Sequence, residues 1–181
     1  FKRKVFYYMR LRNIPGAEDA ISSSEYCIKN PEEHKGLWQE CFPSAQPLHI
    51  EIGMGKGRFI MDMAALHPNI NYIGIERYSS VLLRALQKME VNPLPNIRFI
   101  CMDAADIAEV FAKDEVDRIY LNFSDPWPKD FQTVLRPLRS GFEKRRTSGV
   151  QDRQPGSVHL LLRGSPGSRL ETRCLHKRSA P

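Results

Sequence analysis

Short apolar runs alternate with amphipathic segments along residues 48–123, and this alternation limits the fold more than any other feature of the chain. The expected strands are residues 48–52, 71–75, 97–102 and 117–123, and the expected helices are residues 58–66, 79–89 and 105–111. Strands and helices that alternate in this way are joined by crossovers, which build a parallel sheet covered on both faces. The sequence therefore predicts an α/β fold with a doubly wound, mostly parallel sheet.

The segments on either side lack this alternation. Residues 9–47 form a polar N-terminal segment, basic at its start and interrupted by prolines, with one helix predicted around Glu32–Cys41. Residues 1–8 precede Met9, a natural start, and are interpreted as translated upstream sequence or a cloning remnant. Residues 130–181 are rich in Arg, Ser, Gly and Pro, with one short apolar run at Val158–Leu162. This composition predicts a disordered basic tail after a folded core at residues 48–129.

The basic residues are concentrated at the two ends of the chain. The formal net charge is +6, and residues 1–12 carry five basic residues and no acids. Residues 13–129 carry 11 basic and 17 acidic residues, a net charge of −6, whereas residues 130–181 carry 11 and 4, a net charge of +7. The overall charge therefore does not indicate a basic face on the folded part.

Several classes of protein are disfavoured by composition. No apolar run approaches the roughly 20 residues that a membrane-spanning helix needs, and no export leader is evident. The four cysteines are scattered, without a C-x-x-C pair or a histidine at metal-ligand spacing: Cys27, Cys41, Cys101 and Cys174. We therefore expect no disulfide framework, no metal site and no membrane association, and a location in the reducing cytoplasm.

A glycine-rich loop follows the first predicted strand. Residues 51–57 read Glu-Ile-Gly-Met-Gly-Lys-Gly, and glycine lets the backbone turn sharply and approach a ligand closely. The spacing alone is common in strand–helix turns. Glu51 makes it more specific, because a carboxylate repels a pyrophosphate but attracts a cationic ligand such as S-adenosylmethionine.

Acidic residues also close the next two predicted strands. Glu76 is placed to accept hydrogen bonds from two ribose hydroxyls, as in nicotinamide enzymes, although a solvated glutamate fits the same position. Asp103 is suited to an adenine amino group, but a helix N-cap has the same appearance. Because the carboxyl ends of parallel strands share one edge, Glu51, Glu76 and Asp103 together predict a site for an adenosine-type ligand.

The fourth predicted strand runs into a loop that combines an acid, an aromatic residue and a base. Residues 122–129 read Asn-Phe-Ser-Asp-Pro-Trp-Pro-Lys, with Trp127 between two prolines and Asp125 and Lys129 on either side of them. A rigid turn with a buried tryptophan is the simpler interpretation. The concentration of polar and aromatic groups at a strand end favours a functional loop.

These motifs resemble those of the bacterial tRNA (guanine-N7-)-methyltransferase family. The resemblance covers residues 9–129 and is carried by residues 9–13, 30–31, 49–57, 72–76 and 120–129. It implies a class I S-adenosylmethionine-dependent methyltransferase fold, which is Rossmann-like. It also implies S-adenosylmethionine as the methyl donor, tRNA as the partner, and methylation of N7 of a guanosine in the tRNA variable loop.

The resemblance also implies roles for individual residues. By matching position, the donor contacts are Glu51, Gly53, Gly55, Glu76, Asp103 and Asp125. Asp125 is also the implied catalytic residue, and Lys129 is the implied tRNA contact. No metal ligand is implied.

The chain departs from the family after Lys129. The family continues into a K-R-H-x-K-R-R stretch, and later has F-K-T-D-N-R-G and T-x-[FY]-E motifs, which this sequence lacks. Codons that encode residues 149–156, if read one nucleotide later, permit Glu-Phe-Lys-Thr-Asp-Asn-Arg-Gly. Our hypothesis is a deletion that shifted the reading frame, so that the sheet lacks its last strands and has an exposed edge. We then expect this chain to be weakly active or inactive.

Three other functions remain open at this stage. A different S-adenosylmethionine-dependent methyltransferase would share the glycine loop but leave residues 125–129 unexplained. A nicotinamide-dependent oxidoreductase is disfavoured by the G-x-G-x-G spacing and by Glu51. A non-catalytic basic RNA-binding protein would depend on residues 130–181.

Overall fold

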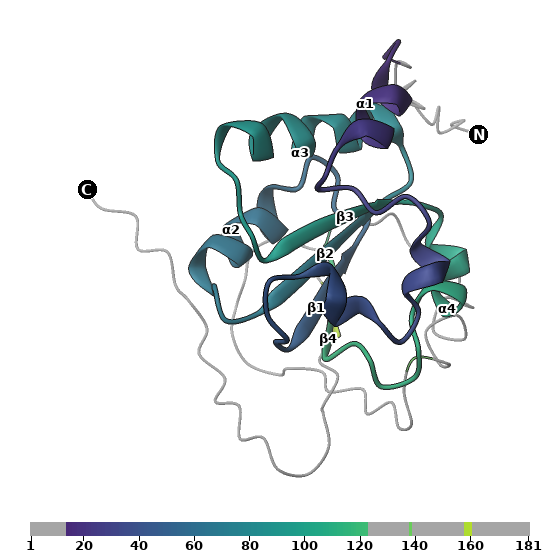
Figure 1. Cartoon of the computed structure of the whole chain (residues 1–181), viewed down its shortest axis with the longest axis vertical. Helices are drawn as coiled ribbons and strands as arrows, with labels where there is room; N and C mark the ends of the chain where they lie inside the picture. The colour runs from purple at the N-terminus through teal and green to yellow at the C-terminus, as the bar shows by residue number, and fades with distance from the viewer. Residues whose placement is uncertain (1–13, 123–137, 139–157, 161–181) are drawn as a thin grey trace, which may run out of the picture.

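The computed structural model describes residues 14–122, Leu138 and residues 158–160, and it contains a five-stranded sheet in the order β3-β2-β1-β4-β5 (Figure 1). The strands are β1 (Leu48–Ile52), β2 (Asn71–Glu76), β3 (Ile97–Cys101), β4 (Arg118–Leu121) and β5 (Val158–Leu160). The first four strands are parallel, and β5 is antiparallel to β4. The predicted α/β fold with a mostly parallel sheet is confirmed.

Helices connect the parallel strands and precede the first of them. The α-helices are α1 (Ala17–Ser23), α2 (Arg58–Leu66), α3 (Ser79–Val91) and α4 (Ile107–Val110), and the 3₁₀ helices are η1 (Pro31–His34), η2 (Trp38–Cys41) and η3 (Ala104–Asp106). All four predicted strands occur within two residues of the expected bounds in the described part of the chain. The predicted third helix is shorter, because η3 occupies its first turn.

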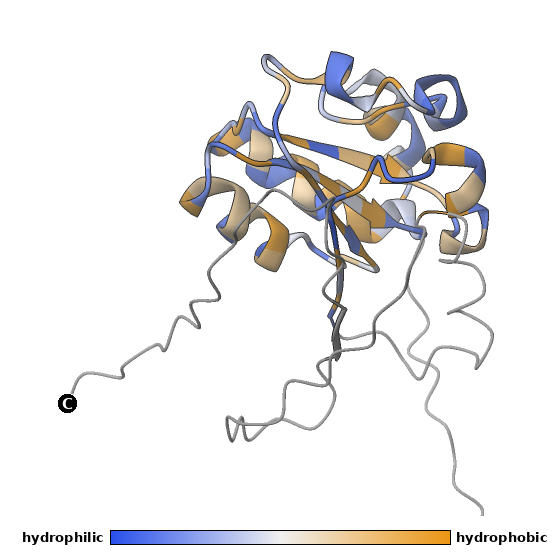
Figure 2. Ribbon diagram, turned by 90° about the horizontal axis from the view of Figure 1, so that it is seen from below, coloured by the Kyte–Doolittle hydropathy of each residue, from blue (hydrophilic) through white to orange (hydrophobic). Residues whose placement is uncertain are grey.

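Two apolar cores lie on opposite faces of the sheet. One contains Trp38 of η2, Phe111 and the residues of α4, packed on Ile50 and Ile52. The other contains the apolar faces of α2 and α3, packed on Tyr72 and Phe99. In Figure 2 orange and blue segments occur together in the central strands and in the helices. Every residue of β1 and β2 is nevertheless buried, as expected of a sheet covered on both faces.

The N-terminal segment differs from the sequence prediction. The helix expected around Glu32–Cys41 is wrong, because η1 and η2 are separate short turns. The carboxylate of Glu115 accepts hydrogen bonds from the backbone amides of Gly36 (3.0 Å) and Trp38 (3.2 Å), so these amides are unavailable to a continuous helix. Helix α1 was not predicted; it packs against α3 through Ile21.

The sheet edge also differs from expectation. We expected an exposed edge beyond the fourth strand, but β5 pairs with β4 in the register Ile119–Leu160, Tyr120–His159 and Leu121–Val158. Leu138, from the same predicted tail, is only 1% exposed and belongs to the core that contains Trp38. Two pieces of the segment predicted to be disordered therefore pack on the described structure, and the rest of residues 130–181 lie outside the described residues.

The described part of the chain contains no helix that is long and apolar enough to cross a membrane. Within those same residues, no group of three or more His, Cys, Asp or Glu side chains is arranged to hold a metal ion. Cys27, Cys41 and Cys101 are free thiols.

Candidate functional site

The strand order brings the predicted site residues to one edge of the sheet. From β1 the chain passes through β2 to β3 on one side, then returns to β4 on the other side of β1. This reversal is a topological switch point, where ligands of open α/β sheets bind at the carboxyl ends of the strands. The glycine loop after β1 and the polar residues after β2, β3 and β4 all lie at that edge.

The glycine loop is held against the end of β2 by its own backbone. The amides of Gly53 and Met54 both donate to the carbonyl oxygen of Ile75, at 2.9 and 3.1 Å. Gly53 and Gly55 have φ values of 69° and 60°, in the left-handed region that other residues rarely adopt. The loop therefore needs glycine for its conformation, and it exposes Gly53 and Lys56 beside the strand ends.

Glu76 links the glycine loop to the start of α3. Its Oε2 accepts a hydrogen bond from the amide of Gly55 at 2.9 Å, and its Oε1 accepts one from the amide of Tyr78 at 3.0 Å. The side chain is buried, with 8% exposed. The alternative of a solvated strand-end glutamate is therefore wrong. Each oxygen retains a second lone pair, so ribose hydroxyls still have acceptors there.

Asp103 occupies the position that the sequence predicted, and it is also a cap. Its Oδ1 accepts a hydrogen bond from the amide of Ala105 at 3.0 Å, which makes it the N-cap of η3. Its Oδ2 lies 3.2 Å from Nη1 of Arg77, in an ion pair between the ends of β2 and β3. The capping interpretation is confirmed, and contact with an adenine amino group stays a prediction.

Among the described acids of the site, Glu51 is the least exposed to solvent. Its side chain is 2% exposed, and its Oε1 accepts a hydrogen bond from Nδ2 of Asn122 at 3.1 Å. Its Oε2 has no hydrogen-bond partner in the described part of the molecule. Burial raises the pKa of Glu51 from 4.5 to about 7, although the Asn122 side-chain amide offsets part of this rise, as does the backbone amide of Ile60, which is near the carboxylate but too poorly placed for a full hydrogen bond.

Sequence reasoning did not single out Asn122 as a site residue. Tyr120 pairs with Glu51 across the β1–β4 ladder, and Asn122 lies two residues further on. Residues two apart on a strand face the same side, so the ladder register brings the Asn122 amide to the Glu51 carboxylate. The signal was an asparagine directly after the fourth strand, at the same edge as the other polar groups.

The site has the chemistry of a cation receptor. Burial disfavours the ionised form of this carboxyl group, and a ligand that brings a positive charge and hydrogen-bond donors to its unpartnered oxygen stabilises that form. The same group would oppose a pyrophosphate. Glu51 therefore fits an adenosine derivative that carries an ammonium or sulfonium group.

Two predicted site residues cannot be placed beside these groups. Asp125 and Lys129 lie outside the described residues. Their roles as catalytic residue and tRNA contact stay predictions. The structure brings together Glu51, Gly53, Gly55, Glu76 and Asp103 at one edge of the sheet.

The sequence is similar to two curated bacterial proteins. It is 56% identical to a tRNA (guanine-N(7)-)-methyltransferase of Lachnoclostridium phytofermentans over 137 residues, which are 76% of this chain and 64% of that protein. It is 58% identical to the protein of the same name from a Geobacillus species over 122 residues, 67% of this chain and 56% of that protein. The chain thus spans less than two thirds of the length of these relatives.

A solved structure and a family model also match. The structure of an antibiotic-related methyltransferase is 26% identical, with 61% of this chain and 53% of that chain covered and a TM-score of 0.41. The model of a family described as putative methyltransferases matches residues 45–144, which is more than half of the chain and includes every site residue discussed above. This chain therefore belongs to that family of putative methyltransferases.

Proposed function

We propose that this chain is a tRNA (guanine-N7-)-methyltransferase that binds S-adenosylmethionine and methylates N7 of a guanosine in the tRNA variable loop. The observation that carries the proposal is the buried Glu51 carboxylate, whose Oε2 has no partner in the described residues, below a left-handed glycine loop. The two relatives at 56 and 58% identity carry this activity in their names. A tRNA substrate also favours a cytoplasmic location for the protein.

Each described site residue would contact a different part of the donor. Glu51 would receive a positively charged group at Oε2, and Gly53 and Gly55 would let the donor approach the backbone. Glu76 would accept the ribose hydroxyls while holding the Gly55 amide. Asp103 would face the adenine while it caps η3.

Methyl transfer to guanine N7 depends on how the donor and the purine are positioned and does not require proton transfer. When bound, S-adenosylmethionine supplies a methyl group on a sulfonium centre. Guanine N7 already has an in-plane lone pair, so no base needs to remove a proton from it. The chain must orient the purine and stabilise the positive charge that develops on it. A carboxylate such as Asp125 is suited to that electrostatic role rather than to the role of a general base.

The extent of activity is a separate part of the proposal. The basic K-R-H-x-K-R-R stretch that follows Lys129 in the family is absent from this sequence. We therefore expect donor binding to survive and methyl transfer to be weak. Lys129 is the tRNA contact that the resemblance leaves in place.

Donor binding is the first test, because it does not require turnover. Calorimetric titration of the full chain with S-adenosylmethionine and with S-adenosylhomocysteine is compared with that of Glu51→Gln. If Glu51 holds the ammonium group, the variant loses affinity for both ligands; if it holds the sulfonium, only S-adenosylmethionine is affected. Binding of NADH in place of either ligand would contradict the proposal.

Methyl transfer identifies the acceptor atom. Three tRNA transcripts are compared, with guanosine, 7-deazaguanosine or adenosine at the variable-loop position. Transfer to the guanosine transcript alone supports N7 as the acceptor, because 7-deazaguanosine replaces only that nitrogen with carbon. Equal transfer to all three, or transfer only to a small molecule, would assign a different methyltransferase activity.

A further inference from the structure

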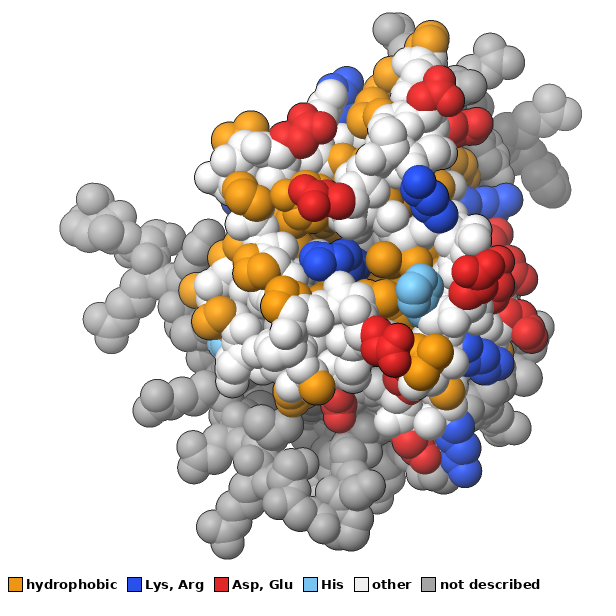
Figure 3. All heavy atoms as spheres, in the orientation of Figure 1, with side chains coloured by type: hydrophobic (Ala, Val, Ile, Leu, Met, Phe, Trp, Pro, Cys, Tyr) orange, Lys and Arg blue, Asp and Glu red, His pale blue; other side chains and the backbone are white. Residues whose placement is uncertain are grey.

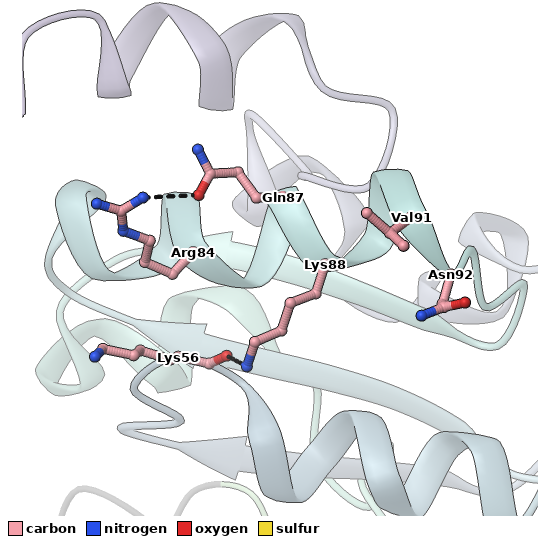
Figure 4. A pocket seen from close by; sticks show the side chains of 6 residues that line it. All are labelled: Lys56, Arg84, Gln87, Lys88, Val91 and Asn92. Atoms are coloured by element: carbon pink, nitrogen blue, oxygen red, sulfur yellow. Dashed lines mark hydrogen bonds between the residues drawn. The ribbon is translucent and has the colours of Figure 1, made fainter.

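A hollow on the outer surface of α3 is lined by positively charged side chains. We call it the basic hollow; Figure 4 shows its six lining residues, which are Lys56, Arg84, Gln87, Lys88, Val91 and Asn92. Lys56 belongs to the glycine loop and the other five to α3 and its C-cap. The hollow is therefore directly connected to the proposed donor site, but none of its side chains takes part in that site.

The three cations of the basic hollow have no acidic neighbour among its lining residues. Lys88 Nζ donates to the carbonyl oxygen of Lys56 at 2.7 Å, and Arg84 Nη1 donates to Oε1 of Gln87 at 2.9 Å. Both partners are uncharged. Within the described ranges, the ion pair recorded is Arg77–Asp103, at a different place in the fold. Among the described residues, no carboxylate is therefore ion-paired with a positive charge of the hollow.

This cluster contrasts with the charge of the surrounding body. Residues 14–122 contain ten Lys and Arg against 16 Asp and Glu, a formal net charge of −6. Figure 3 shows acidic side chains spread over the face drawn there. A polyanion is repelled by most of such a surface and is drawn to the place where three of the ten cations meet.

The hollow is also preorganised for phosphate. Arg84 and Lys88 lie one helical turn apart on the same side of α3, where side chains at i and i+4 are neighbours. The bond to Gln87 restrains the guanidinium of Arg84, whose remaining N–H groups form a fork that matches phosphate oxygens. The bond to the Lys56 carbonyl restrains the ammonium of Lys88 and ties α3 to the glycine loop.

We propose that the basic hollow binds backbone phosphates of the RNA whose guanosine is methylated at the neighbouring site. The inference rests on the proposed function and adds a surface to it. Val91 is 75% exposed and offers an apolar surface to a sugar, and the Asn92 side-chain amide can donate to a second phosphate oxygen. The contacts are to the backbone, so they orient the RNA without reading its sequence.

The test measures binding of a tRNA transcript to the full chain at several salt concentrations. Arg84→Gln and Lys88→Gln each remove one charge. The matched control is Lys35→Gln, because Lys35 Nζ also donates to a backbone carbonyl, that of Ala108, at 2.7 Å on an exposed surface. Each hollow variant is expected to weaken binding about three- to tenfold and to lower the slope of log affinity against log salt by about 0.7–0.9.

The control variant separates this effect from general charge loss. Residues 130–181 are unchanged in every variant. Equal affinities and slopes for Arg84→Gln, Lys88→Gln and Lys35→Gln would overturn the inference. Melting temperatures are compared to confirm that each variant folds; a variant that fails is replaced by Lys56→Gln.

The two proposals fail in different ways. If the hollow variants weaken tRNA binding but the wild-type chain transfers no methyl group to N7, the proposed activity fails and the RNA surface stands. If the wild type methylates N7 and the hollow variants bind and react like the control, the hollow inference fails and the activity stands.

Discussion

Replacement of Glu51 by Gln tests the physical state of the candidate site without any ligand. In the unfolded chain the carboxyl group has a pKa of 4.5, and burial raises the pKa to about 7 in the folded protein. Between these values the unfolded chain has released the proton and the folded protein still holds it. The stability of the wild type therefore falls as pH rises from about 4.5 to about 7.

The size of this loss follows from the difference between the two pKa values. A change of one pKa unit is worth about 1.4 kcal/mol, so the rise to about 7 corresponds to roughly 3 kcal/mol. The loss is absent well below pH 4.5 and complete at pH 8. Glutamine has no proton to release, and its side-chain oxygen can still accept the bond from Asn122. Glu51→Gln therefore avoids the loss entirely.

The assay is urea unfolding of both proteins at a series of pH values from 4 to 8, followed by tryptophan fluorescence, to which the buried Trp38 contributes. The free energy of unfolding of Glu51→Gln minus that of the wild type is expected to increase by roughly 3 kcal/mol over this range. Any constant effect of the new amide appears at every pH and cancels. Glu90→Gln, on the exposed side of α3, is the control for a glutamate that is not buried.

A stability difference that stays constant from pH 4 to pH 8 would refute the reasoning. It would mean that Glu51 titrates alike in the folded and unfolded chains, and that water or a neighbouring group reaches Oε2. If Glu51→Gln is more stable at pH 8 but binds S-adenosylmethionine as tightly as the wild type, the charge of Glu51 is buried but does not contribute to donor binding. The expected result is higher stability together with weaker binding.

Three further outcomes are expected. Gly57→Ala should destabilise the protein by more than the roughly 1–2 kcal/mol that a left-handed backbone conformation costs alanine, because the new Cβ would lie 3.0 Å from Cβ of Ala85. The control is Gly16→Ala, where φ is +78° and nothing lies within 4 Å of the added Cβ. The difference between the two variants in thermal unfolding measures the packing effect. Glu76→Ala should reduce affinity for S-adenosylmethionine about 10- to 100-fold in calorimetry, because two backbone amides lose their charged acceptor. The gene that encodes residues 130–181, read one nucleotide later, should contain the T-D-N motif; a nucleotide sequence without it would reject the frameshift hypothesis.

Local patterns were sufficient for the parallel part of the sheet. The runs at residues 48–52 and 71–75 are short, apolar and bounded by turn residues, so their length and spacing indicated buried strands. The acids at the strand ends were predictable for the same reason, since parallel strands end at one edge. Glu51 and Glu76 are at that edge, and both are buried.

What the sequence did not reveal depends on contacts between distant residues. The helix expected around Glu32–Cys41 is divided because Glu115, about 80 residues away, binds the amides between η1 and η2. Asn122 became visible only through the register of β4 on β1. Strand β5 comes from a stretch whose composition indicates disorder, and its pairing with β4 outweighs that local preference.

The central position of β1 also has a consequence for synthesis on the ribosome. One side of β1 can pair with β2 almost at once, but the other side must wait for β4, which ends at Leu121, roughly 70 residues after Ile52. At about 5–20 residues per second, this wait lasts about 3–14 s. During that time a nascent chain presents an unpaired, apolar strand edge, the kind of surface that promotes aggregation. The arrangement that creates the ligand-binding edge therefore leaves one side of β1 without its partner strand in the emerging polypeptide until β4 has been synthesised.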